Sequence, residues 1–196
     1  EMEASFETTG NRAAYNFDRD IHIKKADGLT SERFIGMDMN VDYMSAVIAC
    51  VYTDGTIHYY DEIRQSNSNT EAMSREMRKR WGLHPIFPDP AGKARSTTSN
   101  RSDHQILKDN GFQVIARVAH PTQKDRLSAL NRMLLDAKDR VKMTIDPSCI
   151  YLIKDLEQVQ RDKKGGIDKS NPELSHMLDA CSYYIEYKHP IVQRVG

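Results

Sequence analysis

The sequence predicts an α/β domain with a central mixed five-stranded sheet, three antiparallel strands followed by two parallel ones, flanked by helices. Three observations predict it. Apolar runs between residues 33 and 66 have the length of strands and are separated by turn residues. Helical patterns then alternate with short apolar runs, as in crossover connections. A chain of 196 residues, 39% hydrophobic and 29% charged, suits one domain with a substantial core.

The first three strands are predicted by apolar runs near residues 34–38, 43–52 and 57–63. Asp54 and Gly55 separate the second run from the third, and this dipeptide is a strong signal for a two-residue hairpin. The three runs therefore predict an antiparallel start. Asp38 stands within the first run, where a buried carboxylate needs a partner.

The rest of the chain alternates between helices and short strands. Met73, Met77 and Trp81 recur every four residues and predict a helix capped by Ser68 or Asn69. The fourth strand is predicted at 86–87 and the fifth at 112–118, with a short helix at 103–110 between them.

Three more helices are predicted in the C-terminal half. One covers residues 123–140, and its basic residues Arg126, Arg132, Lys138 and Arg140 alternate with acids, which indicates a solvated face. The second begins at Pro147 with Asp146 as its cap. The last begins at Pro172 with Asn171 as its cap, because proline favours the first helical position.

Composition restricts the class of protein. Twenty-eight basic and 28 acidic side chains give zero net charge, so a nucleic-acid partner requires cations gathered on one face. Cys50, Cys149 and Cys181 are far apart and form neither a zinc spacing nor a disulfide framework, which indicates a reducing cytoplasm. No apolar run reaches 18 residues, so no membrane partner is expected. The first residue is Glu1, which suggests a fragment of something longer.

Three aspartates interrupt their local apolar patterns: Asp38 in the first strand, Asp89 after the fourth and Asp179 in the last helix. The predicted sheet places the first strand beside the fourth, so these carboxylates can converge. Converging carboxylates need raised pKa values or bound cations. Two Mg²⁺ or Mn²⁺ ions, roughly 3.5–4 Å apart, could then clamp the attacking and leaving oxygens of a phosphodiester. Taken singly, each aspartate also fits a turn, a cap or a solvent-facing position.

Three segments, "FIGMDMNVD", "IFPDPAG" and "ELSHMLDACSYYI", at these intervals resemble the nuclease domain of the large terminase subunit of tailed bacteriophages. That domain belongs to the ribonuclease H-like superfamily, and the resemblance covers about residues 33–187. It implies that Asp38, Asp89 and Asp179 are the catalytic metal ligands. It also implies a ribonuclease H-like nuclease domain at 33–188, a preceding segment at 1–32 that leaves an absent ATPase motor, and a C-terminal tail at 189–196.

The function that this resemblance implies is a metal-dependent endonuclease. It would cut double-stranded concatemeric phage DNA with little sequence preference during genome packaging, by two-metal phosphodiester hydrolysis. Implied partners are the ATPase motor of the same polypeptide, the portal protein and the small terminase subunit, in the host cytoplasm of an infected bacterium. The chain has no Walker motif, so it cannot translocate DNA alone.

Two alternatives stay open at this point. The first is a Holliday-junction resolvase or transposase-like nuclease of the same fold. The second is a catalytically silent module that docks to DNA or portal protein. Replacing any of the three aspartates by asparagine is expected to abolish cleavage and to leave the metal-free fold intact or more stable, because like-charge repulsion is relieved.

Other polar residues are candidates for supporting roles. Asp42 could orient a metal-bound water or shape a turn, and Glu62 is a further acid or an ordinary surface charge. His176 lies one helical turn before Asp179 and could ligate metal, relay a proton or simply pack. Six cations are candidates for contacts to DNA phosphates, with a solvated loop as the alternative. They are Arg161, Lys163, Lys164, Lys169, Lys93 and Arg95.

Overall fold

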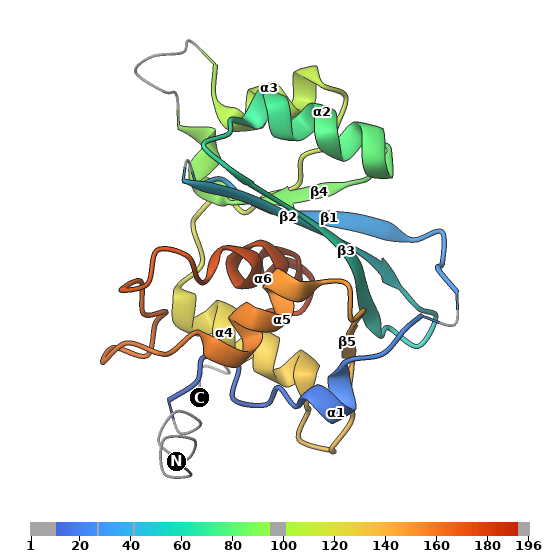
Figure 1. Cartoon of the computed structure of the whole chain (residues 1–196), viewed down its shortest axis with the longest axis vertical. Coiled ribbons are helices and arrows are strands. Elements are labelled where there is room, and N and C mark those ends of the chain that lie inside the picture. The colour runs from blue at the N-terminus through green and yellow to red at the C-terminus, as the bar shows by residue number, and fades with distance from the viewer. Residues whose placement is uncertain (1–10, 27, 41, 95–100, 192–196) are drawn as a thin grey trace.

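A computed structural model describes residues 11–26, 28–40, 42–94 and 101–191 of the chain (Figure 1). Its centre is one five-stranded sheet with the order β4-β1-β2-β3-β5. The antiparallel strands are β1 (Arg33–Asp38), β2 (Tyr43–Val51) and β3 (Ile57–Ser66). β4 (Ile86–Pro88) runs parallel to β1, and β5 (Met143–Ile145) runs parallel to β3. The predicted mixed five-stranded sheet is confirmed.

Helices cover both faces of this sheet (Figure 1). α2 (Thr70–Trp81) and α3 (Asp103–Asp109) pack on one face, over a core that includes Met73, Met77 and Leu107. α4 (Gln123–Leu134), α5 (Ile150–Gln158) and α6 (His176–Lys188) pack on the other face, over the larger core. The short α1 (Arg19–His22) lies beside β5, and the 3-10 helix η1 (Pro90–Lys93) follows β4.

The hairpin between β2 and β3 forms where the sequence predicts it. Gly55 has a φ of 82°, and the carboxylate of Asp54 accepts the amide of Thr56 at 2.8 Å. This turn fixes the register that pairs Ser45 with Arg64, while Asp38 pairs with Ser45 across the neighbouring strands. The end of β1 lies between β4 and β2.

The prediction of a fifth strand at 112–118 is wrong. Val114 forms only an isolated parallel bridge with Ile86, and the fifth strand lies at the opposite edge of the sheet. The segment leaves β4 because its later backbone has another partner: the amino group of Lys93 donates to the carbonyl oxygens of Arg117 and Val118. Those carbonyls belong to a loop anchored on η1.

Three helix boundaries also differ from the predictions. The predicted helix at 123–140 ends at Leu134, because the carboxylate of Asp136 accepts the amides of Lys138 and Arg140 in a separate turn. α5 begins at Ile150 rather than at Pro147. α6 begins at His176 rather than at Pro172, after a residue with a left-handed backbone, Ser175, at φ 78°.

The late starts of α5 and α6 have the same physical cause, which is a carboxylate supplied by another element. Glu62 on β3 accepts the amides of Tyr151 and Leu152 in the first turn of α5. Asp155 on α5 accepts the amides of Met177 and Leu178 in the first turn of α6. These contacts satisfy amides that a local cap would otherwise satisfy. They connect β3 to α5 and α5 to α6.

α6 lies unusually close to β1. A Cβ atom at Gly36 would be 2.2 Å from the carbonyl oxygen of Ala180 on α6. Only glycine permits this approach of the two backbones. Gly36 lies two residues before Asp38 and Ala180 directly follows Asp179, so this close approach lies beside both aspartates.

The described N-terminal residues pack against the body of the domain. Ala13, Ala14 and Phe17 are buried in the larger core, and Ile23 forms a parallel bridge with Ile145. Whether residues 1–32 lead from an ATPase motor stays a prediction. Among the described residues, no helix is long and apolar enough to cross a membrane.

Candidate functional site

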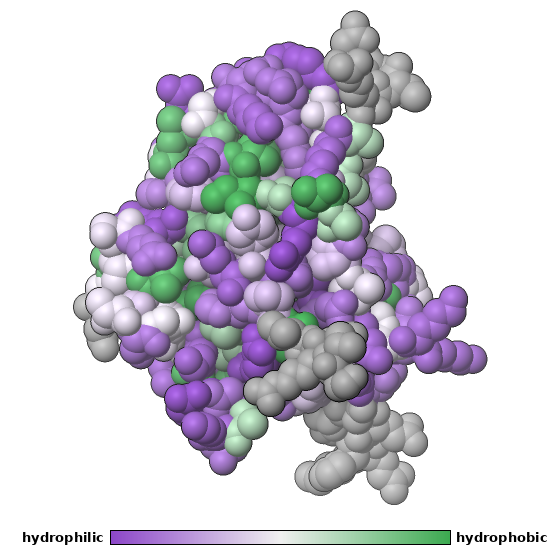
Figure 2. All heavy atoms as spheres, turned by 180° about the vertical axis from the view of Figure 1, so that it is seen from behind, coloured by the Kyte–Doolittle hydropathy of each residue, from purple (hydrophilic) through white to green (hydrophobic). Residues whose placement is uncertain are grey.

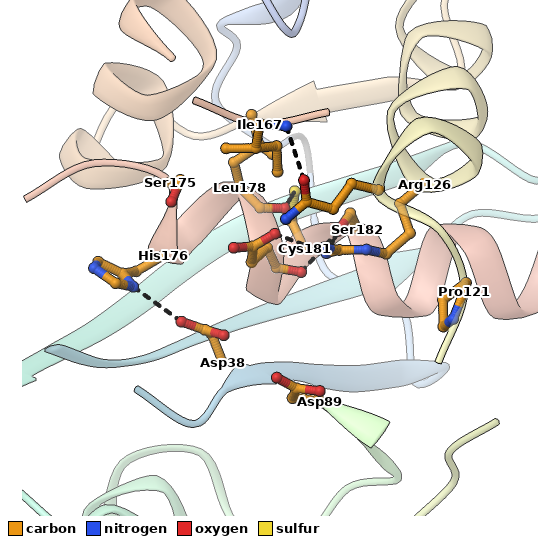
Figure 3. Close-up of polar contacts among 12 residues, drawn as sticks. Asp38, Asp89, Pro121, Arg126, Ile167, Ser175, His176, Leu178, Cys181 and Ser182 are labelled. Atoms are coloured by element: carbon orange, nitrogen blue, oxygen red, sulfur yellow. Dashed lines mark hydrogen bonds and ion pairs between the residues drawn. The ribbon is translucent and has the colours of Figure 1, made fainter. Parts of the chain in front are cut away.

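Asp38 and Asp89 lie at the carboxyl ends of two adjacent parallel strands, β1 and β4 (Figure 3). Met37 pairs with Pro88, and the amide of Asp89 donates to the carbonyl oxygen of Met37 at 2.9 Å. The two strands therefore end at the same level. Asp38 is buried, whereas Asp89 is partly exposed.

The partner of Asp38 is His176, in the first turn of α6 (Figure 3). Its Nδ1 lies 3.0 Å from Oδ2 of Asp38, and its Nε2 donates to the carbonyl oxygen of Pro172 at 2.9 Å. Burial, opposed by the bond to His176, raises the pKa of Asp38 to about 6. Burial also opposes the charged imidazole, but the bonds to Asp38 and Pro172 outweigh it and raise the pKa of His176. The contact between Asp38 and His176 therefore opposes the cost of burying either charge.

Asp89 has a similar partner, His120. Nε2 of His120 lies 3.1 Å from Oδ1 of Asp89, while its Nδ1 donates to the carbonyl oxygen of Pro121 at 2.9 Å. The same Oδ1 of Asp89 accepts the amide of Ala91, which caps η1. The site thus contains two Asp–His pairs, and in each pair a proline carbonyl binds the outer ring nitrogen.

Asp179 is bound by two cations. Nη1 of Arg126 donates to Oδ1 of Asp179 and to Oγ of Ser182, each at 2.8 Å (Figure 3). The amino group of Lys169 donates to Oδ2 of Asp179 and also to Oγ of Ser175. The side chains of Arg126 and Asp179 are only 2% and 5% exposed, so this ion pair is buried. Both carboxylate oxygens of Asp179 are therefore engaged within the protein.

Tyr183, one turn after Asp179, lies within electrostatic reach of all three aspartates. Burial raises the pKa of its hydroxyl, Arg126 opposes this effect, and the negative charges of Asp179, Asp38 and Asp89 raise the pKa further. The guanidinium of Arg126 stacks over the Tyr183 ring at 4.7 Å. The three carboxylates thus surround one region, between the strand ends and α6.

The donor atoms of this region suit a divalent cation. Asp38 and Asp89 each place a carboxylate oxygen about 3 Å from an imidazole nitrogen, and mixed oxygen and nitrogen donors suit ions such as Mn²⁺. Within the described part of the chain, no three His, Cys, Asp or Glu side chains are close enough to form one ion site. Both carboxylate oxygens of Asp179 are bound to Arg126 and Lys169.

The other two acidic candidates lie outside this cluster. Glu62 is buried on β3 and both of its oxygens accept amides of α5, so its contacts are structural. Asp42 is exposed in the turn between β1 and β2, where its amide donates to Asn40. Neither side chain has a contact with Asp38, Asp89 or Asp179 among the hydrogen bonds of the described residues.

The candidate DNA contacts have different surroundings. Lys163 and Lys164 are exposed at the tip of a short hairpin closed by the bridge between Arg161 and Ile167. Arg161 stacks over the ring of Tyr15 at 5.4 Å. Lys169 reaches Asp179, and Lys93 binds the loop carbonyls described above. Arg95 lies outside the described residues.

Sequence reasoning missed three residues of this region: Arg126, His120 and Asp155. The expected solvated position of Arg126 is wrong, because its side chain is buried against α6. A signal was available, since the residues three, four and seven positions later are Ala129, Leu130 and Met133, which form an apolar helical face. His120 and Asp155 carry no comparable local signal.

Comparisons with known proteins identify the family and the fold. Residues 35–188 match the family model of the terminase RNaseH-like domain. The search of curated proteins found no match. The large terminase nuclease domain of bacteriophage P22 is 15% identical, with a TM-score of 0.66 over 90% of this chain and 93% of that one.

Two further phage structures share the fold. The large terminase nuclease domain of bacteriophage SPP1, solved with bound Mn, is 15% identical, with a TM-score of 0.58 over 84% of this chain and 94% of that one. The large terminase of bacteriophage HK97 is 12% identical, with a TM-score of 0.55 over 87% of this chain and 42% of that one. At these identities the similarity establishes the fold.

Proposed function

Because the chain belongs to the terminase RNaseH-like domain family, we propose that it is a divalent-metal-dependent endonuclease. Its substrate would be double-stranded concatemeric phage DNA, cut with little sequence preference during genome packaging in the host cytoplasm. The observation that carries the proposal is the position of three aspartates around one region. Asp38 and Asp89 end adjacent parallel strands, and Asp179 lies on the helix packed against β1.

We assign Asp38, Asp89 and Asp179 as the residues that would hold two Mg²⁺ or Mn²⁺ ions. When bound, such ions supply Lewis-acid stabilisation of the charge that develops on the phosphodiester oxygens. The chain's own part is to place the carboxylates. Gly36 fixes the distance between β1 and α6, and Asp155 holds the first turn of α6 in place.

Charged side chains near the aspartates would position the DNA. Lys169 binds Asp179 in the metal-free protein, and its side chain is 47% exposed, so its amino group can turn toward a phosphate when a cation occupies the site. Lys163 and Lys164 are exposed on the hairpin that precedes Lys169 and would make further contacts to phosphates. Contacts of this kind are made to phosphates, which supports cleavage with little sequence preference.

The proposed partners follow from the family. We propose that the ATPase motor of the same polypeptide, the portal protein and the small terminase subunit assemble with this domain in the packaging machine. Cleavage by the isolated chain would then be weaker than cleavage in the presence of the motor, which would help to hold DNA on the site.

The test is cleavage of linear and supercoiled plasmid in Mn²⁺, in Mg²⁺ and in EDTA. The chain should cut in at least one metal and not in EDTA, and Asp89→Asn should lose that cleavage. Asp20→Asn, which changes an exposed aspartate on α1, is the matched control and should cut normally. Normal cleavage by Asp89→Asn would refute the site. A chain inert in every metal, even with its motor restored, would support a silent docking module.

A further inference from the structure

We propose that His120 is a metal ligand that forms a cation site together with Asp89, in addition to the three aspartates. This inference rests on the proposed function, because it concerns the same site. It adds a nitrogen donor from the loop that follows residue 116, a segment that the proposed function above does not use. The expected ligand is a divalent ion that accepts mixed nitrogen and oxygen donors, such as Mn²⁺.

The first argument is the distance between the two donor atoms. Nε2 of His120 and Oδ1 of Asp89 are 3.1 Å apart. Two neighbouring ligands of an octahedral ion, with bonds of about 2.1 Å at a right angle, are separated by about 3 Å. The pair can therefore accept one ion with little movement of either side chain.

The second argument is the orientation of the ring. Nδ1 of His120 donates to the carbonyl oxygen of Pro121 at 2.9 Å, so the proton on that nitrogen is fixed and Nε2 faces the carboxylate. Metal-binding histidines commonly donate their other ring N–H to a carbonyl or carboxylate, which fixes the tautomer. The Asp38–His176 pair has the same arrangement, with Pro172 as the acceptor.

The third argument is that the loop carrying His120 is anchored at several points. Lys93 donates to the carbonyls of Arg117 and Val118. Arg117 donates to the carboxylate of Glu186 at 2.9 Å and to its carbonyl oxygen at 3.1 Å. The His120 ring also packs edge-on against Tyr183, with centroids 6.1 Å apart. A ligand needs such support, because it must hold its geometry before the ion arrives.

The fourth argument is access. The side chain of His120 is 42% exposed and that of Asp89 is 20% exposed, so an ion can reach both from solvent. The other Asp–His pair is buried, with Asp38 and His176 at 9% and 7%. Asp89 and His120 are therefore the more accessible pair.

The experiment is calorimetric titration of the full chain with Mn²⁺ and with Mg²⁺, comparing wild type, His120→Gln and His84→Gln. His84 is the matched control because it is a partly buried histidine whose ring bonds to the carbonyl of Trp81, away from the aspartates. His120→Gln should bind Mn²⁺ about tenfold more weakly. Its affinity for Mg²⁺ should change less, because Mg²⁺ prefers oxygen donors. Pulsed electron paramagnetic resonance of bound Mn²⁺ should show one fewer coupled nitrogen.

The direction of the change separates ligation from a simple charge pair. A protonated His120 that only neutralises Asp89 would repel a cation, so its loss would leave Mn²⁺ affinity unchanged or make it tighter. Either result would overturn the proposal. Asp89→Asn distinguishes the two levels of inference: if it weakens Mn²⁺ binding and His120→Gln does not, only the role of His120 fails. If neither weakens binding, the proposed metal site fails as well.

Discussion

Asp179 differs from the other two aspartates in how its charge is balanced. Asp38 bonds to His176, and Asp89 is partly exposed. Asp179 instead forms a buried ion pair with Arg126, whose Nε has no hydrogen-bond partner. The expectation that an asparagine at each position leaves the fold as stable, or more so, does not apply to Asp179. Its loss would leave a buried guanidinium without its counter-charge.

This difference predicts a stability effect. Asp179→Asn should lower the free energy of unfolding by about 3 kcal/mol, the usual cost of removing one partner of a buried ion pair. Asp89→Asn is the matched control: its amide oxygen can still cap η1, so the change should stay below about 1 kcal/mol. Urea denaturation in EDTA measures both. Equal stability of the two variants would contradict the buried pairing.

At this scale the sequence identifies residues better than it identifies partners. Asp38, Asp89 and Asp179 are detectable because each is charged at a position where the local pattern is apolar. The contacts of Asp179 with Arg126 and of Asp89 with His120 join residues 53 and 31 positions apart. Such pairings depend on packing between elements, which no local pattern records.

The starts of the helices also depend on partners that local sequence does not predict. A local cap predicts α2 correctly, because Asn69 accepts the amide of Ala72. Asp146 and Asn171 mislead, because each makes a turn of its own, accepting the amides of Ser148 and Glu173. The true caps of α5 and α6 are Glu62 and Asp155, which come from other elements.

The cap on α5 predicts a pH dependence of stability. Burial raises the pKa of Glu62 from 4.5 to about 7, although the amides of Tyr151 and Leu152 oppose the shift. The folded state then binds the Glu62 proton more tightly than the unfolded chain does. The free energy of unfolding should therefore fall between pH 4.5 and 7, by at most about 3 kcal/mol, and the Glu62 contribution should stay constant above pH 7.

Chemical denaturation at several pH values would measure this fall. Glu62→Gln should flatten the profile across the same window, since a glutamine does not titrate. Glu157→Gln is a suitable control because Glu157 lies on α5, the helix that Glu62 caps, and forms a surface ion pair with Arg19 of α1. A profile with the same slope in wild type and Glu62→Gln would show that Glu62 titrates alike in both states.

At the scale of the whole molecule, the sequence predicts the mixed sheet and the neighbouring position of the first and fourth strands, but it does not predict where the fifth strand lies. Long apolar runs and the Asp54–Gly55 turn specify the first three strands. The fifth strand has only three residues, Met143–Ile145, too few to show a period. The run at 112–118 has a more strand-like pattern, but the carbonyls of its last two residues, Arg117 and Val118, bind Lys93.

The surface of the domain is relevant to whether the proposed nuclease prefers linear or branched DNA. The face shown in Figure 2 is mainly hydrophilic, with apolar side chains in small separate areas. Lys163, Lys164 and Lys169 are exposed cations that suit contacts to phosphates, which linear and branched DNA both present, so we expect no preference for a junction. A fourfold excess of unlabelled four-way junction should inhibit cleavage of labelled linear duplex no more than the same mass of unlabelled duplex. Selective inhibition by the junction would instead favour a resolvase.

The approach of Gly36 to the carbonyl of Ala180 also affects how freely this sequence can evolve. At Gly36 the spacing between β1 and α6 is limited by main-chain atoms rather than by the shape of a side chain. Most positions around the site can therefore drift without moving the aspartates, provided that a glycine stays two residues before the first. We expect functional descendants of this chain to diverge widely in sequence while retaining both this glycine and the aspartate that follows it.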